Sequence, residues 1–244
     1  MVETSRSSKM WLPLESNPQV FTDFAQKLGY PSLLYSFHDV YALDKDTWLS
    51  AIPQPVIGVV LLYQIKKHHK DIIRQDLEAQ QKLQTLTGDL QPPFFIKQTI
   101  SNACGTIALL HLLCNTLSQC GGIDPESFLA SFLTVPQTPL DRAKYLETDE
   151  KFEATHEAMA KEGSTDAASA MGTSSHFVAY VMGEGGRLWE LDGRQSEPVL
   201  KGQLEEGEHL GVRVSSIVQR YIDMEEGKEI RFNVMALAPN QGDW

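Results

Sequence analysis

The amino-acid sequence predicts a layered domain in which helices pack on β-strands, of the α/β or α+β class. Three segments carry this prediction. Residues 55–65, PVIGVVLLYQI, are nearly all apolar, which is typical of a central strand buried on both faces. Residues 102–117, NACGTIALLHLLCNTL, form a strongly apolar run that predicts a buried helix. Residues 176–193, HFVAYVMGEGGRLWELDG, alternate like two strands joined at Gly185 and Gly186.

The first predicted helix follows an extended N-terminal segment that contains WLPLESNPQV. Asn17 is a suitable N-cap, Pro18 stands at the first helical position, and Gly29 ends the helix. Residues 36–43, SFHDVYAL, favour a strand. A helix and a strand therefore precede the central strand.

Residues 66–86 are polar with sparse apolar positions, and they predict either a solvated helix or a long excursion. His68 and His69 lie in this segment. Because no partner stands at metal-ligand spacing, we expect a surface pair rather than a zinc site.

The second half of the chain alternates short elements with one polar stretch. Residues 125–133 and 140–146 predict two short helices. Residues 161–175, KEGSTDAASAMGTSS, show neither helical nor strand periodicity and predict a mobile loop. Residues 229–239, EIRFNVMALAP, predict the last strand.

Length and composition favour one globular unit. The chain has 244 residues, 42% of them hydrophobic and 22% charged, so a sizeable core can form. No repeat or Pro/Gly-rich linker divides it, and we expect a single domain over residues 1–244. No apolar run reaches the roughly 20 residues that span a bilayer, and the segment MVETSRSSKMW lacks the apolar stretch of a signal peptide. We expect no membrane association.

Cysteine usage and charge restrict the compartment and the partners. Cys104, Cys114 and Cys120 are odd in number and crowded, which does not suit a disulfide framework and favours the cytoplasm. The net charge is −11. Such a surface disfavours nucleic acid and favours a basic partner, although many proteins are acidic simply for solubility.

Cys104 is a candidate nucleophile because it stands at or near the start of the apolar helix. There the unpaired N–H groups and the helix dipole favour the thiolate, and Gly105 leaves room for a substrate backbone to approach. The competing interpretation is a buried, inert thiol, and Cys114 and Cys120 fit that interpretation.

His176 and Asp192 are candidates for the base and for the group that orients it. His176 begins one strand of the predicted hairpin and Asp192 ends the other, so an imidazole and a carboxylate could lie side by side. An Asp before Gly is also a common turn residue, and a strand His is often structural. Gln98, six residues before Cys104, could help to hold an oxyanion. Spacing alone leaves these alternatives open.

Three motifs resemble one enzyme family. Residues 95–113, FIKQTISNACGTIALLHLL, are similar to the active-site segment of the ubiquitin C-terminal hydrolases, which are papain-like cysteine peptidases. SHFVAYV at residues 175–181 resembles their histidine segment, and LWELDGR at residues 188–194 their aspartate segment. WLPLESNPQV and RFNVMALA resemble the family termini. The resemblance covers nearly the whole chain and is closest to small single-domain members.

This resemblance implies a function and a role for each residue. The enzyme would be a thiol hydrolase that cuts after the C-terminal glycine of ubiquitin through a Cys104 thioester. Gln98 and the Cys104 amide would form the oxyanion hole, His176 would transfer protons, and Asp192 would orient His176. No metal or organic cofactor is implied, and we expect a monomer.

The family fold implied is a three-layer α-β-α sandwich with a mostly antiparallel central sheet and a knotted backbone. A crossover loop over about residues 147–175 would pass above the site and admit small adducts, peptides or unfolded tails. Its final part, ASAMGTSSH, is smaller and less charged than the family pattern, and residues 66–87 match the pattern poorly.

The resemblance also implies substrate contacts, mostly acidic because the ubiquitin tail carries arginines. Each acid could equally be a solvated surface charge. The implied contacts are Pro13, Leu14, Glu15, Asp39, Glu162, Asp166, Glu229 and Phe232.

Three alternatives stay open at this point. The enzyme could prefer a related ubiquitin-like modifier, or the chain could bind monoubiquitin with little turnover. A generic papain-like peptidase is a third, although the motifs around Cys104 and Asp192 do not fit it.

Overall fold

The strands that the structure describes form one six-stranded sheet in the order β1-β6-β2-β3-β4-β5, with every neighbouring pair antiparallel. This computed structural model describes residues 9–64, 66–87, 91–134, 138–163, 175–224 and 232–240. The strands are β1 Tyr35–Asp39, β2 Gly58–Gln64, β3 Ser175–Met182, β4 Arg187–Leu191, β5 Val199–Gln203 and β6 Phe232–Pro239. The expectation of a mostly antiparallel sheet is confirmed.

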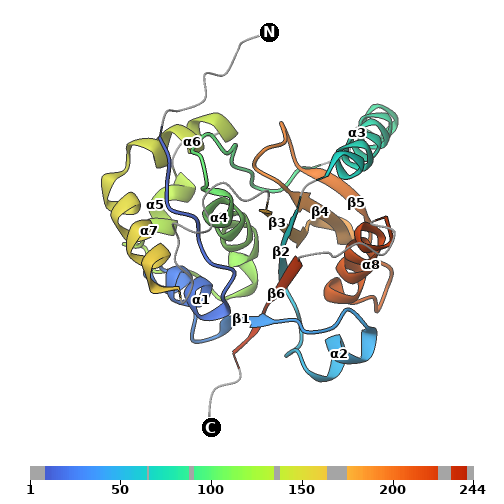
Figure 1. Ribbon diagram of the computed structural model, residues 1–244, viewed down its shortest axis with the longest axis horizontal. Helices are drawn as coiled ribbons and strands as arrows, with labels where there is room; N and C mark the ends of the chain where they lie inside the picture. Colours follow the sequence, from blue (N-terminus) through green and yellow to red (C-terminus); the bar gives the residue numbers. More distant parts are fainter. Residues whose placement is uncertain are drawn as a thin grey trace.

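Helices cover both faces of this sheet. They are α1 Pro18–Lys27, α2 Lys45–Ser50, α3 Lys67–Thr87, α4 Cys104–Thr116, α5 Phe128–Thr134, α6 Pro139–Thr148, α7 Glu150–Glu162 and α8 Leu210–Asp223. Figure 1 shows α1 and α4 to α7 on one side of the strands and α2, α3 and α8 on the other. The predicted three-layer arrangement is therefore confirmed. The knot stays a prediction, because the described residues leave out 164–174 of the predicted crossover.

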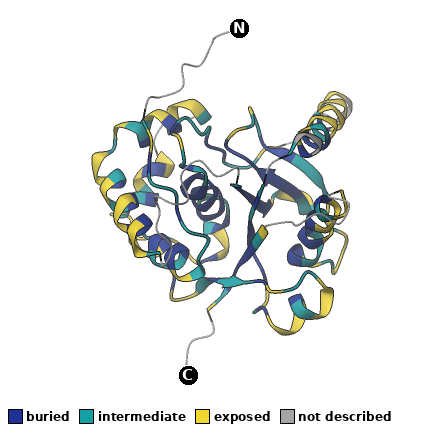
Figure 2. Cartoon of the chain, in the orientation of Figure 1, coloured by how far each residue is buried: buried dark blue, intermediate teal, exposed yellow. Residues whose placement is uncertain are grey.

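Strand β2 is central in both sequence pattern and structure. It lies between β3 and β6, and its residues alternate between two hydrophobic cores. Val60 belongs to the core beneath α4, whereas Val59 and Leu61 belong to the core beneath α8. Figure 2 shows α4 and the central strands as the most buried part of the molecule. Burial on both faces explains why residues 58–62 of this strand are all apolar.

The predicted N-terminus of α1 is confirmed. The Asn17 side chain accepts from the N–H groups of Gln19 and Val20, at 2.9 and 3.4 Å, and Pro18 is the first helical residue. Gly29 has a φ of +95°, the left-handed conformation that ends many helices. The cap therefore fixes the point at which the extended N-terminal segment turns into the fold.

Part of the predicted crossover loop is helix α7. Its N-cap Asp149 accepts a hydrogen bond from the Phe152 N–H, at 2.9 Å. Phe152, His156 and Met159 then recur on one face and are buried. The expectation of a loop over residues 147–175 is thus wrong for α7, because a capped amphipathic helix forms there. Residues 164–174 lie outside the described residues.

The predicted segment 66–86 forms helix α3, and His69 is not at the surface. Only 3% of His69 is exposed, and its ring contacts Tyr63 and Tyr221 at centroid distances of 5.3 and 4.9 Å. The expected surface position is wrong for His69, because its ring contributes to packing between α3, β2 and α8. No prediction covered α2, β5 or α8. Among the described residues, no helix is both long enough and apolar enough to span a membrane.

Candidate active site

Cys104 is the first residue of helix α4, as the sequence predicts. The preceding Ala103 provides no side-chain cap. No capping side chain therefore accepts from the N–H groups of the first turn, which begins at Cys104. Gly105 is buried, and a Cβ there would lie 3.1 Å from Leu14 Cβ and 3.3 Å from the Phe177 ring. The space beside Gly105 is thus filled by the protein itself, which corrects the expectation that it admits substrate. Because Gly105 has no side chain, the start of helix α4 can pack closely against the N-terminal segment and β3.

His176 and Asp192 form a buried pair. His176 Nε2 donates to Asp192 Oδ1 at 2.6 Å, and the two side chains are 0% and 1% exposed. His176 lies at the start of β3 and Asp192 directly after β4, its antiparallel neighbour. The hairpin predicted from the sequence therefore brings the imidazole and the carboxylate together.

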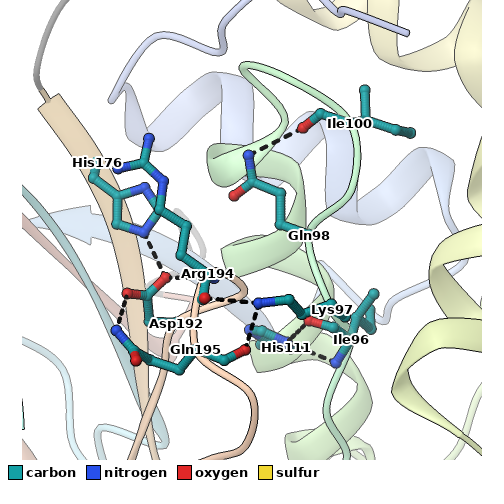
Figure 3. Close-up of polar contacts among 9 residues, drawn as sticks. All are labelled: Ile96, Lys97, Gln98, Ile100, His111, His176, Asp192, Arg194 and Gln195. Atoms are coloured by element: carbon teal, nitrogen blue, oxygen red, sulfur yellow. Dashed lines mark hydrogen bonds and ion pairs between the residues drawn. The ribbon is translucent and has the colours of Figure 1, made fainter. Parts of the chain in front are cut away.

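Asp192 is also the turn residue that the competing interpretation suggested. Its carboxylate accepts from the Arg194 N–H at 2.8 Å and from Gln195 Nε2 at 3.3 Å, and its carbonyl accepts from the Gln195 N–H at 2.8 Å. Figure 3 shows these contacts converging on the carboxylate that holds His176. The turn therefore fixes the orientation of the carboxylate.

The electrostatics favour a thiolate beside an imidazolium. Burial alone would raise the pKa of Cys104, but the neighbouring His176 and its imidazolium charge bring the pKa below its ordinary value. Burial alone would lower the pKa of His176, yet its hydrogen bond to Asp192 and the negative charges of Asp192 and the Cys104 thiolate raise it to about 9. Burial would raise the pKa of Asp192, and the contact with His176 lowers it. Since Nε2 is used by Asp192, Nδ1 of His176 is the nitrogen available to the thiol.

Gln98 lies against the turn that follows Asp192. Its backbone N–H donates to the Gly193 carbonyl at 2.8 Å, and its side-chain Nε2 donates to the Ile100 carbonyl at 3.0 Å. An amide nitrogen has two hydrogens, so one remains for a ligand. A Cβ on Gly193 would lie 2.9 Å from Gln98 Cβ, so only glycine permits this contact. These contacts thus fix the position of Gln98 relative to Asp192.

A cavity of about 680 Å³ opens beside these groups. One wall consists of residues 98–102, and a second of Asp192, Arg194 and Gln195. The third wall is helix α3, which no sequence motif placed near the site. The polar sequence of α3 does not indicate which face of the helix lines a cavity formed by residues distant in the chain.

Several predicted substrate contacts come together at one end of the sheet. Ser16, next to Glu15, donates to Asn233 at 2.6 Å, and Asn233 donates to Asp39 at 3.4 Å. Phe232 is 39% exposed and pairs across the sheet with Tyr63, which pairs in turn with His176.

Other predicted contacts do not join this group. Leu14 is only 5% exposed and packs on Gly105. Glu162 pairs with Lys27 of α1 at 3.4 Å. Pro13 is half-buried in the N-terminal segment. Asp166 and Glu229 lie outside the described residues.

Sequence reasoning missed the residues that hold the site together through the backbone. Lys97 Nζ donates to the carbonyls of Arg194 and Gln195, at 2.7 and 2.8 Å. His111 of α4 accepts from the Ile96 N–H at 2.9 Å and stacks on Phe95. Contacts with backbone groups leave no pattern in the sequence, so no signal could have identified them.

The comparisons with known proteins agree with this arrangement. A sequence model described as "Ubiquitin carboxyl-terminal hydrolase, family 1" matches residues 11–223. Ubiquitin carboxyl-terminal hydrolase 3 of Arabidopsis thaliana is 37% identical over 96% of both chains. A ubiquitin carboxyl-terminal hydrolase of Drosophila melanogaster is 38% identical over 95% of this chain and 98% of its own.

A solved structure shows the same fold. The Trichinella spiralis UCH37 catalytic domain, bound to ubiquitin vinyl methyl ester, superposes with a TM-score of 0.71 at 22% identity. The match covers 97% of this chain and 99% of that domain. On the evidence of its sequence, this chain belongs to family 1 of the ubiquitin carboxyl-terminal hydrolases.

Proposed function

We propose that this deubiquitinating cysteine hydrolase cuts the bond after the C-terminal glycine of ubiquitin, with Cys104 as its nucleophile. The observation that carries the proposal is the buried His176–Asp192 pair, joined at 2.6 Å, beside a thiol at the first residue of a buried helix. The reaction class follows from the family, whose relatives are ubiquitin carboxyl-terminal hydrolases.

The acylation step uses all four proposed catalytic residues. The Cys104 thiolate attacks the glycine carbonyl carbon, and the oxygen gains negative charge. The Cys104 N–H and the second Nε2 hydrogen of Gln98 would hold that oxygen. His176 then gives its proton to the leaving amine, the C–N bond breaks, and a thioester remains on Cys104. Asp192 keeps the imidazole oriented and stabilises its positive charge.

Hydrolysis of the thioester reverses the proton movement. Neutral His176 takes a proton from water through Nδ1 while the water oxygen attacks the thioester carbonyl. The C–S bond breaks, the thiolate is regenerated beside imidazolium, and ubiquitin leaves with a free carboxylate. No step needs a further reactant.

Ubiquitin as the partner is supported by the names of the relatives and by the ubiquitin derivative bound to the Trichinella enzyme. The basic ubiquitin tail also suits a chain whose net charge is −11. Pro13, Leu14, Glu15, Asp39, Glu162, Asp166, Glu229 and Phe232 are the substrate contacts proposed. Small adducts, peptides and unfolded tails are the leaving groups proposed.

The wider setting is part of the same proposal. Residues 1–244 would act as one monomeric catalytic domain in the cytoplasm, with no nucleic acid or membrane partner. Two cores on opposite faces of a single sheet support one folding unit, and the three unpaired cysteines suit a reducing compartment.

The test is hydrolysis of a fluorogenic amide of the ubiquitin C-terminus by the wild type and by Cys104→Ala. Turnover by the wild type alone supports the proposal, provided that Cys104→Ala still binds ubiquitin. Faster turnover of the amide of a related modifier would show that this modifier, and not ubiquitin, is the preferred substrate. Tight ubiquitin binding without any turnover would instead indicate a binding module.

A further inference from the structure

The cavity beside Gln98 and Asp192 has basic walls in an otherwise acidic protein. The cations that line it are Lys70, Arg74 and Arg194, and its one carboxylate is Asp192, which is engaged with His176. The whole chain carries 32 acidic residues and 21 basic ones. An excess of positive charge at this place therefore runs against the balance of the molecule.

From this contrast we infer that the cavity is a subsite for the leaving group and prefers an acidic peptide segment directly after the scissile bond. The inference rests on the proposed function, because it needs a bond to be cut at Cys104. It adds a substrate preference that the catalytic groups alone do not determine.

One face of α3 forms the wall opposite the catalytic turn. Lys70, Ile73, Arg74 and Leu77 line the cavity, and their spacing of three and four residues places them on one side of the helix. Ile73 is buried, whereas Lys70 and Arg74 are exposed. The two cations therefore stand over an apolar base, with their charged ends exposed to solvent.

Two residues in the middle of α3 fix its position. Gln80 Oε1 accepts from the Leu200 N–H at 2.7 Å, and Asp76 pairs with Lys201 at 2.6 Å. Both partners belong to β5. The helix is thus tied to the sheet, and the Lys70–Leu77 face has a defined place beside the site.

The positive charges of these cations are mostly not neutralised by carboxylates of the protein. Among the described residues, Lys70 and Arg194 have no carboxylate partner, and Arg74 pairs only with Asp71, at 3.1 Å on the same exposed helix face. Exposed pairs of this kind contribute little, so a ligand carboxylate can compete with Asp71. A peptide with acidic side chains would meet two or three cations here.

The cavity lies on the side where a leaving group would emerge. The proposed contacts of ubiquitin include Leu14, which packs on Gly105, and Glu15, which lies against Gly163 at the end of α7. Figure 1 shows α7 and α3 on opposite sides of the sheet. If the acyl chain approaches from the α7 side, the departing amine points toward α3. The volume of about 680 Å³ falls within the range of roughly 300–1,000 Å³ typical of ligand sites.

The test uses ubiquitin carrying short C-terminal extensions that differ only in charge. One extension begins with Asp and Glu, its match begins with Asn and Gln, and a third begins with Lys. We expect kcat/KM of the wild type to be about three- to tenfold higher for the acidic extension than for its amide match, the range that one or two exposed ion pairs supply. Because both substrates contain the same ubiquitin, the contribution of its contacts to kcat/KM cancels in the ratio between extensions.

Two comparisons show whether the cavity causes that ratio. Lys70→Glu with Arg74→Glu should bring the ratio to one or invert it, whereas Lys82→Glu, the same change on an exposed part of α3 outside the cavity, should preserve it. For the wild type, raising the salt from about 50 to about 500 mM should lower the ratio toward one by screening. This second comparison does not depend on whether the double variant folds.

Equal cleavage of the acidic and amide extensions by the wild type would overturn the subsite and leave the proposed function intact. A ratio that Lys70→Glu with Arg74→Glu and salt both leave unchanged would overturn it as well. No cleavage of any extension would overturn the proposed function, and the subsite with it.

Discussion

Asp192 connects the chemistry of the site to its structure. One carboxylate holds His176 at 2.6 Å and also accepts from the Arg194 N–H at 2.8 Å. Because the same turn carries Gly193, which lies against Gln98, the base and the proposed oxyanion donor share one support. Substitutions at Asp192 and at Gly193 should therefore have different effects. Loss of the Asp192 contact should act mainly on catalysis, and loss of the close contact at Gly193 should also lower stability.

Replacing Asp192 by Asn tests the first contact. The amide keeps the size of the side chain but removes the charge that helps to raise the pKa of His176 to about 9. A His with a raised pKa keeps its proton until the pH rises through that value, so activity that needs imidazolium is lost above about pH 9. In Asp192→Asn this alkaline limb should move to lower pH, and kcat/KM should fall about 10²- to 10⁴-fold. An unchanged limb in the pH profile of kcat/KM would show that Asp192 does not act through His176.

Replacing Gly193 by Ala tests the second contact. The added Cβ would lie 2.8 Å from Ile107 Cγ2 and 2.9 Å from Gln98 Cβ, so the turn or Gln98 must move. We expect a loss of about 1–3 kcal/mol in the free energy of unfolding together with a lower kcat. Urea denaturation and turnover measure the two effects, and Ser196→Ala, at an exposed position of the same turn region, is the control. Full activity in Gly193→Ala would mean that Gln98 need not be held here.

At the scale of helices and strands, two buried histidines secure the helices that frame the site. His111 binds the Ile96 N–H from α4, at 2.9 Å. On α7, His156 donates through Nε2 to the Leu12 carbonyl at 2.9 Å, contacts Thr106 Oγ1 at 2.8 Å and stacks on Trp11. His111 Nε2 accepts the Ile96 N–H, and the burial of both rings favours their neutral forms.

Acid should therefore loosen these helices. Burial lowers the pKa of both His111 and His156 to about 4, below the ordinary value of about 6.5. The unfolded chain binds protons first as the pH falls below about 6.5, so stability is lost between about pH 6.5 and pH 4. From pH 6.5 to pH 5 the free energy of unfolding should drop by on the order of 3 kcal/mol.

Urea denaturation at several pH values measures this loss. His156→Gln, which cannot be protonated, should reduce the pH dependence, whereas His209→Gln at an exposed site should leave it as it is. A pH dependence that His156→Gln does not change would contradict the assignment.

The elements show what the sequence can predict and what it cannot. Strand β2, helix α4 and the β3–β4 hairpin were predictable because periodicity and glycine positions report burial and turns directly. Helix α7 was not predictable in the same way, because charges interrupt its short apolar face. The positions of Cys104, His176 and Asp192 were predictable as motifs. The wall formed by α3 was not, because it depends on tertiary contacts such as Gln80 with Leu200.

For the whole molecule, the net charge of −11 predicts how binding responds to salt. An acidic enzyme that binds a basic ubiquitin tail should lose affinity as ionic strength rises. Ubiquitin binding by Cys104→Ala, measured by calorimetry from low to high salt, should weaken several-fold. An affinity that does not change with salt would mean that charge does not guide the encounter.

The most direct test of the central claim is to find which cysteine ubiquitin vinyl methyl ester modifies. The pKa of Cys104 is lowered, on balance, by His176 after the opposing effect of burial, whereas burial raises the pKa of both Cys114 and Cys120. Only Cys104 should therefore react as a thiolate. Mass spectrometry of the digested wild type should show one adduct, on Cys104, and Cys104→Ala should show none. An adduct on Cys114 or Cys120, or an unmodified Cys104 in the wild type, would contradict the account.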